Sequence, residues 1–264
     1  MKITAAIITF NEAANIRAAC ESVEWADEIL VVDSESTDKT REIAASCGAR
    51  VLVKKWQGFS RQKQFATEEA EFDWIFSLDA DERVSNELRR EILKLKETVE
   101  ADLADGYKIP RRNWYMNRWI RGGGWYPNRQ LRFFNRKRGK WKDVLIHESL
   151  EMKEGARILH LTEDILHFSI KTAAEHHRLI GERYAPLAAR QMFERGRRTS
   201  ALEIAAAAPV AFLQTFLLKN GWRDGLAGFC IARFAAQHAF LKHLLLWELQ
   251  QSEGQSVENG KRKD

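Results

Sequence analysis

Short apolar segments alternate with segments of helical spacing along the first hundred residues. Apolar runs rich in β-branched residues predict strands, whereas apolar residues three or four positions apart predict helices. The predicted strands are 2–9, 28–32, 50–53 and 73–78. The predicted helices are 12–23, a segment capped by Ser36 or Thr37 that runs to about 46, 60–70, and 85–99 with Ser85 as its cap. Because strands that alternate with helices are joined by right-handed crossovers, we expect one mostly parallel α/β sheet flanked by helices.

The pattern changes to long helical segments near residue 171. Helices are predicted at 173–194, 200–219 and 225–250, followed by a polar tail, 251–264, that has too few apolar residues to fold. The segment 201–218 is apolar enough to suggest a membrane span, but Glu203, Pro209 and Gln214 interrupt it, so we do not predict a transmembrane helix. Two interpretations stay open. The helices pack on the rest of the protein or on another subunit, or they attach to anionic lipid through Arg190, Arg195, Arg197 and Arg198.

Cysteine usage and the N-terminus indicate where the chain resides. Its three cysteines, Cys20, Cys47 and Cys230, are widely spaced and lack metal-ligand spacing, which is typical of a reducing compartment. The first apolar run is interrupted by Asn11 and Glu12 and has no small-residue cleavage site, so it indicates a strand and not an export signal. We therefore expect a cytoplasmic protein.

Positive charge and aromatic residues are concentrated in one tract. Residues 107–142 contain twelve Lys or Arg, nine aromatic residues and no Asp or Glu, in a chain of 264 residues with a net charge of +5. Such a surface favours an anionic partner with flat apolar faces. Nucleic acid, anionic lipid headgroups and phosphorylated sugars all satisfy this description, and composition does not choose among them.

Polar residues follow three of the predicted strands, at 9–12, 33–38 and 79–82. A single Asp after a strand is often an ordinary turn or capping residue. Because parallel strands end at a common edge, we expect the three segments to converge on one site. Asp79 and Asp81 alternate in phase on an extended chain, so both carboxylates are expected to face one divalent cation.

Glycine-rich phosphate-binding motifs are absent from the sequence. No G-x-G-x-x-G follows the first strand, and no G-x-x-x-x-G-K-[ST] occurs anywhere. A nucleotide at this edge must therefore use side-chain contacts to its base and ribose, with a metal supporting its diphosphate. The histidines at 147, 160 and 167 lack the H-E-x-x-H spacing, which disfavours a zinc hydrolase.

The ordered set of motifs resembles the family 2 glycosyltransferases of GT-A fold, and within them the lipopolysaccharide-core enzymes similar to heptose β-1,4-glucosyltransferases. The segments that carry the resemblance are Thr9-Phe10-Asn11-Glu12, Asp33-Ser34-Glu35-Ser36-Thr37-Asp38-Lys39-Thr40, Asp79-Ala80-Asp81-Glu82, Gly124-Trp125-Tyr126-Pro127 and His147-Glu148. The Q-x-x-R-W motif of processive members is absent, which favours the addition of one sugar over polymer synthesis.

The resemblance implies a domain plan. A GT-A catalytic domain would occupy residues 1–170, with a nucleotide-sugar half at 1–100 and an acceptor half at 101–170. A helical extension at 171–250 and a disordered tail at 251–264 would follow.

The resemblance also implies roles for individual residues at the donor site. Thr9, Asn11, Glu12 and Asp33 would line the nucleoside pocket, Lys63 would approach the uracil or the diphosphate, and Asp79 and Ala80 would contact the donor. Asp81 would bind Mg²⁺ or Mn²⁺, and His167 would complete the metal's coordination. Plainer interpretations are that Glu12 is a first-turn helix acid, Lys63 a solvated helix residue and His167 a buried core histidine.

A carboxylate is the natural base for an acceptor hydroxyl that attacks the sugar from the face opposite the leaving group, which inverts the anomeric centre. Glu148 and Glu82 are the candidates. Glu148 is favoured because it follows the basic aromatic tract, whereas a metal ion beside Glu82 would lower its basicity. The acceptor is expected to contact Arg112, Trp114, Trp125 and Tyr126, since rings pack on sugars and arginine binds phosphate.

The sequence therefore predicts an inverting, metal-dependent glycosyltransferase that moves one sugar, by the resemblance from UDP-glucose, to a lipopolysaccharide inner-core or related glycolipid. A peripheral position on the inner face of the cytoplasmic membrane would suit such an acceptor. Two other classes remain open: a nucleic-acid-binding protein that uses the tract 107–142, and a membrane-surface scaffold without catalysis. The donor sugar, the acceptor hydroxyl and the oligomeric state are left open.

Overall fold

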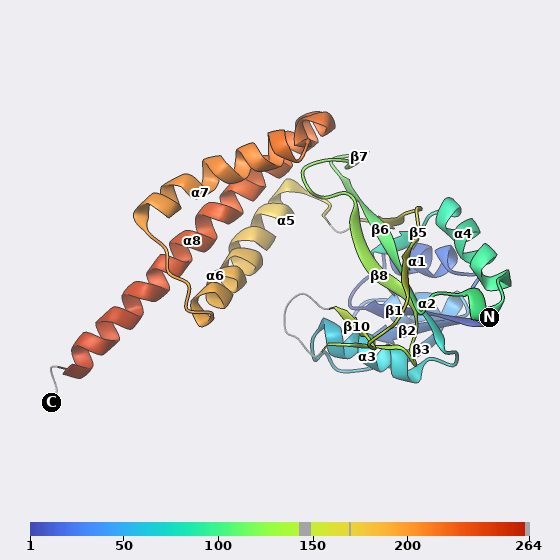
Figure 1. The fold of residues 1–264 in the computed structure, drawn as a ribbon. Helices are drawn as coiled ribbons and strands as arrows, with labels where there is room; N and C mark the ends of the chain where they lie inside the picture. The colour runs from blue at the N-terminus through green and yellow to red at the C-terminus, as the bar shows by residue number, and fades with distance from the viewer. Residues whose placement is uncertain (143–148, 169, 262–264) are drawn as a thin grey trace. The chain divides into compact units, whose positions relative to one another are not determined.

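The computed structural model describes residues 1–142, 149–168 and 170–261, without the side chains of 100 and 254–261. The chain forms two compact units (Figure 1). The first comprises Met1–Asn113 and Pro127–Ser169, and the second comprises Trp114–Tyr126 and Ile170–Asp264.

The first unit is built on a mixed sheet in the order β3-β2-β1-β4-β8-β6-β12-β5, with β11 and β7 also paired to β6. Strands β3, β2, β1 and β4 are parallel, and β8 runs antiparallel to both β4 and β6. The strands of this sheet are β1 (Ile3–Thr9), β2 (Glu28–Asp33), β3 (Arg50–Val53), β4 (Trp74–Asp79), β5 (Glu82–Val84), β6 (Gly106–Tyr115), β7 (Arg118–Trp119), β8 (Asn128–Asn135), β11 (Ile158–His160) and β12 (Ile165–His167). A separate two-stranded sheet pairs β9 (Gly139–Trp141) with β10 (Leu150–Met152).

Helices cover both faces of the parallel part, which explains why its strands are apolar throughout. Alternate residues of β1 enter two different cores: Ile3, Ala5 and Ile7 join one cluster, and Ala6 and Ile8 join the other. The first cluster also contains residues of α1 (Ile16–Ser22), α2 (Thr40–Ser46) and α4 (Asn86–Glu97), and the second contains a residue of α3 (Phe59–Glu69). A 3₁₀ turn, Glu100–Asp102, follows α4. The expected α/β architecture is therefore confirmed.

The predicted strands and helices of the first hundred residues are all present, with differences at helix starts. α1 begins at Ile16 and not at 12, because the residues before it form a turn. The predicted cap at Ser36 or Thr37 is wrong. α2 begins at Thr40 after Lys39, without a side-chain cap, while Ser36 binds Asp33 instead. Ser85 caps α4 as predicted, since its Oγ accepts a hydrogen bond from the Leu88 N–H at 3.1 Å.

The second unit contains the predicted helical region, with bounds that differ in detail. Two of its helices contain π-helical segments, and the last helix continues to Lys261, although the sequence predicted a disordered tail from 251. The elements are α5 (Ala173–Arg178), η2 (Leu179–Tyr184), α6 (Ala185–Glu194), α7 (Ala201–Leu213), η3 (Gln214–Leu218), η4 (Gly221–Asp224) and α8 (Gly225–Lys261).

Residues 114–126 belong to this helical unit, although the sequence analysis assigned them to an acceptor half at 101–170. Buried Asp224 accepts hydrogen bonds from the backbone N–H groups of Arg121, at 3.1 Å, and Gly122, at 2.6 Å. The apolar cluster beside it joins Tyr115 and Ile120 to two residues of α8, Ala227 and Ile231. These contacts involve residues about a hundred positions apart, so local sequence patterns give no sign of them.

Within the described ranges, one helical stretch is long and apolar enough to cross a membrane. It is Ala201–Leu218, with a mean hydropathy of 1.7, and only 6% of it is buried inside the protein. The sequence analysis noted the same apolar stretch and predicted no transmembrane helix there, because Glu203, Pro209 and Gln214 interrupt it. Length and composition are the only grounds for this identification.

Candidate active site

Three polar segments meet at the carboxyl edge of the parallel strands. Thr9 ends β1 and lies beside Asp33 at the end of β2, while Asp79 at the end of β4 pairs in register with Ile8. This is the edge at which open α/β sheets bind ligands. The structure thus brings together the segments that the sequence analysis expected to converge.

The loops after β1 and β2 are tied to each other by side chains. Ser36 Oγ donates to Asp33 Oδ2 at 2.5 Å and accepts a hydrogen bond from Asn11 N–H at 2.8 Å. Asn11 Oδ1 in turn accepts from Thr37 N–H at 2.8 Å. Asn11 has a φ of 53°, a left-handed conformation that Asn tolerates better than most residues. Fully buried Asp33 therefore shapes this loop, and a nucleoside contact would be additional to its bonds with Ser36.

Thr9 and Glu12 lie at the same edge. Thr9 is buried, and among the described residues its hydroxyl has no hydrogen-bond partner, which is costly unless a ligand supplies one. Glu12 Oε2 accepts from Asn15 Nδ2 at 2.6 Å. Since α1 begins only at Ile16, Glu12 lies before the helix, and its interpretation as a first-turn acid is wrong.

A buried network of charges surrounds Asp79. Lys63 Nζ lies 3.0 Å from Asp79 Oδ1, and an Arg132 terminal nitrogen lies 2.9 Å from Asp79 Oδ2. The same Arg132 nitrogen lies 3.0 Å from Glu82 Oε1, which also accepts from Arg111 at 3.1 Å. Lys63, Arg132 and Arg111 thus surround Asp79 and Glu82 at the end of β4. Cationic side chains at a strand end favour a phosphate group nearby.

The cations hold the Asp79 carboxyl in its ionised form. Burial raises its pKa, but Coulombic attraction to Arg132 and Lys63, together with their hydrogen bonds, outweighs burial and holds the pKa well below the ordinary 3.8. Lys63 is 2% exposed, so its interpretation as a solvated helix residue is wrong. Ala80, predicted to contact the donor, is buried at the turn that follows Asp79.

Asp81 faces a histidine and not Asp79. His167 Nε2 lies 3.3 Å from Asp81 Oδ2, and His167 Nδ1 lies 2.6 Å from Asn113 Oδ1. The amide oxygen of Asn113 accepts a hydrogen bond and so places the proton of a neutral imidazole on Nδ1. Nε2 is then the ring nitrogen that faces the Asp81 carboxylate.

This pair fits a divalent cation. Carboxylate and imidazole are ligands for Mn²⁺, and two ligands at right angles, each about 2.1 Å from one ion, lie roughly 3.0 Å apart. The separation of 3.3 Å between Asp81 and His167 is close to that value. In the part of the chain that the structure describes, no group of three or more His, Cys, Asp or Glu gathers to hold a metal. An ion here would therefore take its remaining ligands from diphosphate and water, as Mg²⁺ commonly does.

The expectation that Asp79 and Asp81 face one cation is wrong in its geometry. It assumed an extended chain through both residues, but β4 ends at Asp79 and the chain turns at 80 and 81 before β5. The turn directs Asp79 to Lys63 and Arg132, and Asp81 to His167.

Of the two candidate bases, Glu148 lies outside the described residues. Glu82 is fully buried, and its oxygens accept hydrogen bonds from Arg111, from Arg132 and from the Asp79 N–H. A carboxylate enclosed in this way cannot reach an acceptor hydroxyl, so its role is to hold the two arginines.

The four predicted acceptor residues are separated between the two units. Arg112 lies in the first unit and forms an ion pair with Asp164 at 2.5 Å. Trp114, Trp125 and Tyr126 belong to the second. There Trp125 is half-buried, with its ring 5.4 Å from that of Tyr115 and 5.8 Å from that of His176.

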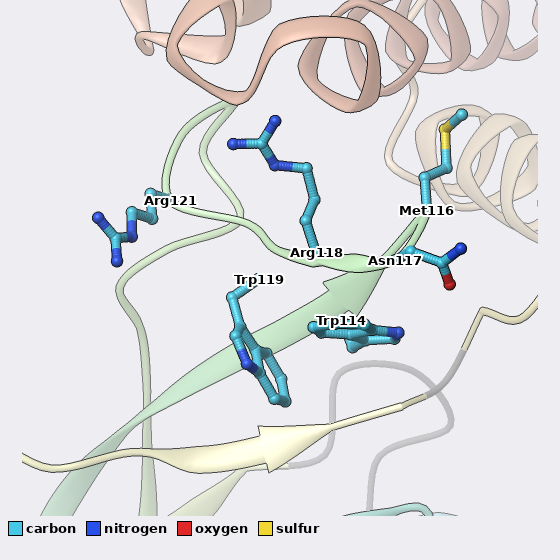
Figure 2. Close-up of a pocket in the computed structure, with 6 residues that line it drawn as sticks. All are labelled: Trp114, Met116, Asn117, Arg118, Trp119 and Arg121. Carbon is cyan, nitrogen blue, oxygen red and sulfur yellow. The ribbon is translucent and has the colours of Figure 1, made fainter.

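Trp114 lines an open groove of about 620 Å³ on the second unit (Figure 2). Its ring meets that of Trp119 edge to face at 4.9 Å. Between β6 and β7, Met116 and Asn117 have φ values of 48° and 59°, the left-handed conformation of a tight hairpin that is strained for Met. The remaining residues of the groove are Met116, Asn117, Arg118 and Arg121.

Several residues of the site escaped the sequence analysis. Arg132 stands between Leu131 and Phe133 in β8, and a charge between two apolar neighbours in a strand is a signal of a buried partner. Arg111 and Asn113 carry no such signal, because each is next to Arg112 in the sequence.

Comparison with known proteins identifies the family of the chain. The family model described as glycosyl transferase family 2 matches residues 4–152. An uncharacterized glycosyltransferase of Rickettsia bellii (strain RML369-C) is 35% identical over 257 residues, which cover 94% of this chain and 87% of that protein. The lipopolysaccharide core biosynthesis glycosyltransferase LpsC of Rhizobium meliloti (strain 1021) is 32% identical over 252 residues, 91% of this chain and 90% of that protein.

Solved structures give more distant similarities. S. aureus TarS 1–349 in complex with UDP-GlcNAc has a TM-score of 0.47 and 13% identity, over 96% of this chain and 92% of that chain. Glucosyl-3-phosphoglycerate synthase from Mycobacterium tuberculosis, with Mn²⁺ and UDP, has a TM-score of 0.35 and 23% identity, over 43% and 44%. The extent of the family match and of the similarity to the two bacterial relatives decides between an enzyme and the two alternative classes: the chain belongs to glycosyl transferase family 2 and is a glycosyltransferase.

Proposed function

We propose that this glycosyltransferase is inverting and metal-dependent, and that it transfers one sugar from a nucleoside-diphosphate donor, UDP-glucose by the family resemblance, to a lipopolysaccharide-core glycolipid. The observation that carries the proposal is the pairing of Asp81 Oδ2 with His167 Nε2, beside the buried contacts of Lys63 and Arg132 with Asp79. The acceptor class is supported by the relative LpsC, whose name assigns it to lipopolysaccharide core biosynthesis.

At the donor site, Asp81 and His167 would hold the cation, and Asn113 would orient the His167 ring so that Nε2 faces it. A bound Mg²⁺ or Mn²⁺ supplies positive charge that stabilises the departing diphosphate. Lys63 and Arg132 add positive charge to the same edge, and Asp79 orients both. Thr9, Asn11, Glu12 and Asp33 would bind the nucleoside, with the Thr9 hydroxyl gaining a hydrogen-bond partner.

For the acceptor, Glu148 would take the proton from the attacking hydroxyl, and direct attack would invert the anomeric centre. The groove of the second unit suits a phosphorylated saccharide. Trp114 and Trp119 can pack against a sugar ring, and Arg118 and Arg121 have no carboxylate within 4 Å in the described part of the chain. A glycolipid acceptor also implies a peripheral position on the inner face of the cytoplasmic membrane.

The test is calorimetric titration with UDP-, GDP-, ADP- and CMP-sugars, with and without Mn²⁺, followed by mass spectrometry of the product formed on lipopolysaccharide core. Asp81→Asn is expected to remove the Mn²⁺ dependence of nucleotide binding and to lower transfer on the order of 10³-fold. Asp73→Asn is the matched control, because Asp73 pairs with Arg136 and Lys137 at the amino end of β4, opposite to Asp79, and the change should leave both unchanged.

Glu148→Gln separates the base from the donor site. Donor binding should persist while transfer falls on the order of 10³-fold. Transfer at an unchanged rate by Glu148→Gln would reject Glu148 as the base. Mn²⁺-dependent binding and transfer retained in Asp81→Asn would reject the proposed metal site.

A further inference from the structure

The stretch formed by α7 and η3, Ala201–Leu218, carries large apolar side chains in contact with solvent. Leu202 and Leu218 are each 78% exposed, and Leu213 and Leu217 are each 51% exposed. Val210, Leu213 and Leu217 form one stripe at helical spacing, since they are three and four residues apart. Isolated exposed leucines are ordinary, but a stripe of this length is not.

The exposed apolar surface continues past η3 onto η4 and the start of α8. Trp222, Leu226 and Phe229 are 54%, 68% and 44% exposed. α7 runs along α8 (Figure 1), and the ring of Phe212 in α7 lies 5.7 Å from that of Phe229 in α8. We name the exposed apolar side chains of this helical pair the apolar ridge: Leu202, Val210, Leu213, Leu217, Leu218, Trp222, Leu226 and Phe229.

Positive charges lie at both ends of the apolar ridge. Arg195, Arg197 and Arg198 precede α7, and Lys219 and Arg223 follow η3. Arg197 and Arg198 lie near Glu203 and Glu253, but Arg195, Lys219 and Arg223 have no carboxylate within 4 Å among the residues that the structure describes. Cations that flank an apolar helix, with a tryptophan at its boundary, match the headgroup and acyl layers of an anionic membrane.

We propose that the apolar ridge docks into the surface of an anionic phospholipid bilayer, with α7 lying in the interface and Arg195, Lys219 and Arg223 contacting lipid phosphates. Lipid is favoured over a second copy of the chain because α7 is apolar around most of its circumference and is flanked by free cations at both ends. A self-complementary interface would need acidic partners for these cations. The proposal identifies the surface behind the peripheral position proposed above, and it does not depend on sugar transfer.

The experiment is co-sedimentation of the full-length protein with vesicles of phosphatidylcholine containing phosphatidylglycerol, and with vesicles of phosphatidylcholine alone. Wild-type protein is expected to pellet with the anionic vesicles. The double variant Leu213→Asn and Leu217→Asn should weaken partitioning at least about ten-fold. The variant Lys219→Gln and Arg223→Gln should weaken binding to anionic vesicles only. Val99→Asn is the matched control, since Val99 is 69% exposed in the first unit and should have no effect.

Calorimetric binding of UDP-sugar to each variant reports whether the first unit is folded, and so separates loss of docking from loss of the donor site. Two results would overturn the proposal. The leucine variants could bind vesicles as tightly as the wild type. Alternatively, wild-type protein could ignore vesicles and form a dimer that the leucine variants convert to a monomer, which would make the apolar ridge an interface between copies.

Discussion

The two units bury their polar groups in opposite ways. The first encloses ionised groups, with Lys63, Arg132 and Arg111 arranged around Asp79 and Glu82. The second encloses a neutral histidine: His176 is 6% exposed, its Nδ1 lies 3.0 Å from the Tyr115 hydroxyl, and its ring lies 4.1 Å from that of Phe234. Charge at the strand ends suits the binding of an anionic donor, whereas the second unit is held by ring packing and by the backbone hydrogen bonds to buried Asp224. The two units should therefore respond differently to mutation and to acid.

The largest expected effect is on the charge network. Arg132→Met should lower the free energy of unfolding of the first unit by about 3 kcal/mol, because Asp79 and Glu82 stay buried with one cation each. Chemical denaturation followed by circular dichroism measures this loss. Arg90→Met is the control, since Arg90 pairs with Glu87 at the surface and its loss should cost less than about 1 kcal/mol. Equal losses in the two variants would show that the buried network stabilises the first unit no more than a surface ion pair does.

As the pH falls, the second unit should lose stability before the first unit does. Burial lowers the pKa of His176 from 6.5 to about 4, so that below pH 6.5 the unfolded state binds a proton that the folded state does not. This destabilises folding by about 1.4 kcal/mol per pH unit, or about 2 kcal/mol from pH 6.5 to 5. His238 and His243, whose pKa values burial also lowers, add to the slope.

Scanning calorimetry of wild type and His176→Phe between pH 7.5 and 5 tests this. The variant should lose most of the pH dependence of the second unit, whatever its stability at pH 7.5. The first unit should keep its stability over this range, because the pKa of Asp79 is lowered and its stabilising contribution is lost only below about pH 4. If the stability of the second unit depends on pH as strongly in His176→Phe as in the wild type, His176 is not the source of the dependence.

Close backbone packing in the second unit gives the next prediction about its stability. Gly228 in α8 approaches Gly221 so closely that a Cβ at 228 would lie 1.8 Å from the carbonyl oxygen of Gly221. Gly228→Ala should therefore destabilise the second unit by about 2 kcal/mol. Gly181→Ala is the matched helical control, with nothing within 4 Å of its added Cβ, and it should be neutral or stabilising. Thermal unfolding curves of both variants measure this difference in stability.

The smallest expected effect concerns the orientation of His167. Asn113→Ala should weaken Mn²⁺-dependent nucleotide binding about ten-fold, the lower end for loss of such a partner, because the pairing of β12 with β6 still positions His167. Titration of UDP-sugar with and without Mn²⁺ measures this change. Binding without Mn²⁺ should be unaffected, and an equal loss in both conditions would indicate a purely structural role for Asn113.

Much of the first unit could be predicted from local patterns. Strand runs such as 2–9 and 28–32 are apolar because the parallel sheet is covered on both faces, and the polar residues that follow them mark its carboxyl edge. The partners at that edge could not be predicted. The turn at 80 and 81 directs Asp79 and Asp81 to different partners. The Asp-x-Asp sequence does not reveal this turn, because the same pattern also occurs in an extended strand.

The sequence by itself determined the alternation of strands and helices, the helical C-terminal region and the set of residue types at the strand ends, because each depends on side chains a few positions apart. Only the tertiary structure decided that Arg132 joins Lys63 at Asp79, that Asn113 orients His167 toward Asp81, and that 114–126 pack with the C-terminal helices. These contacts join segments tens of residues apart, and their free energy exists only once the chain is folded.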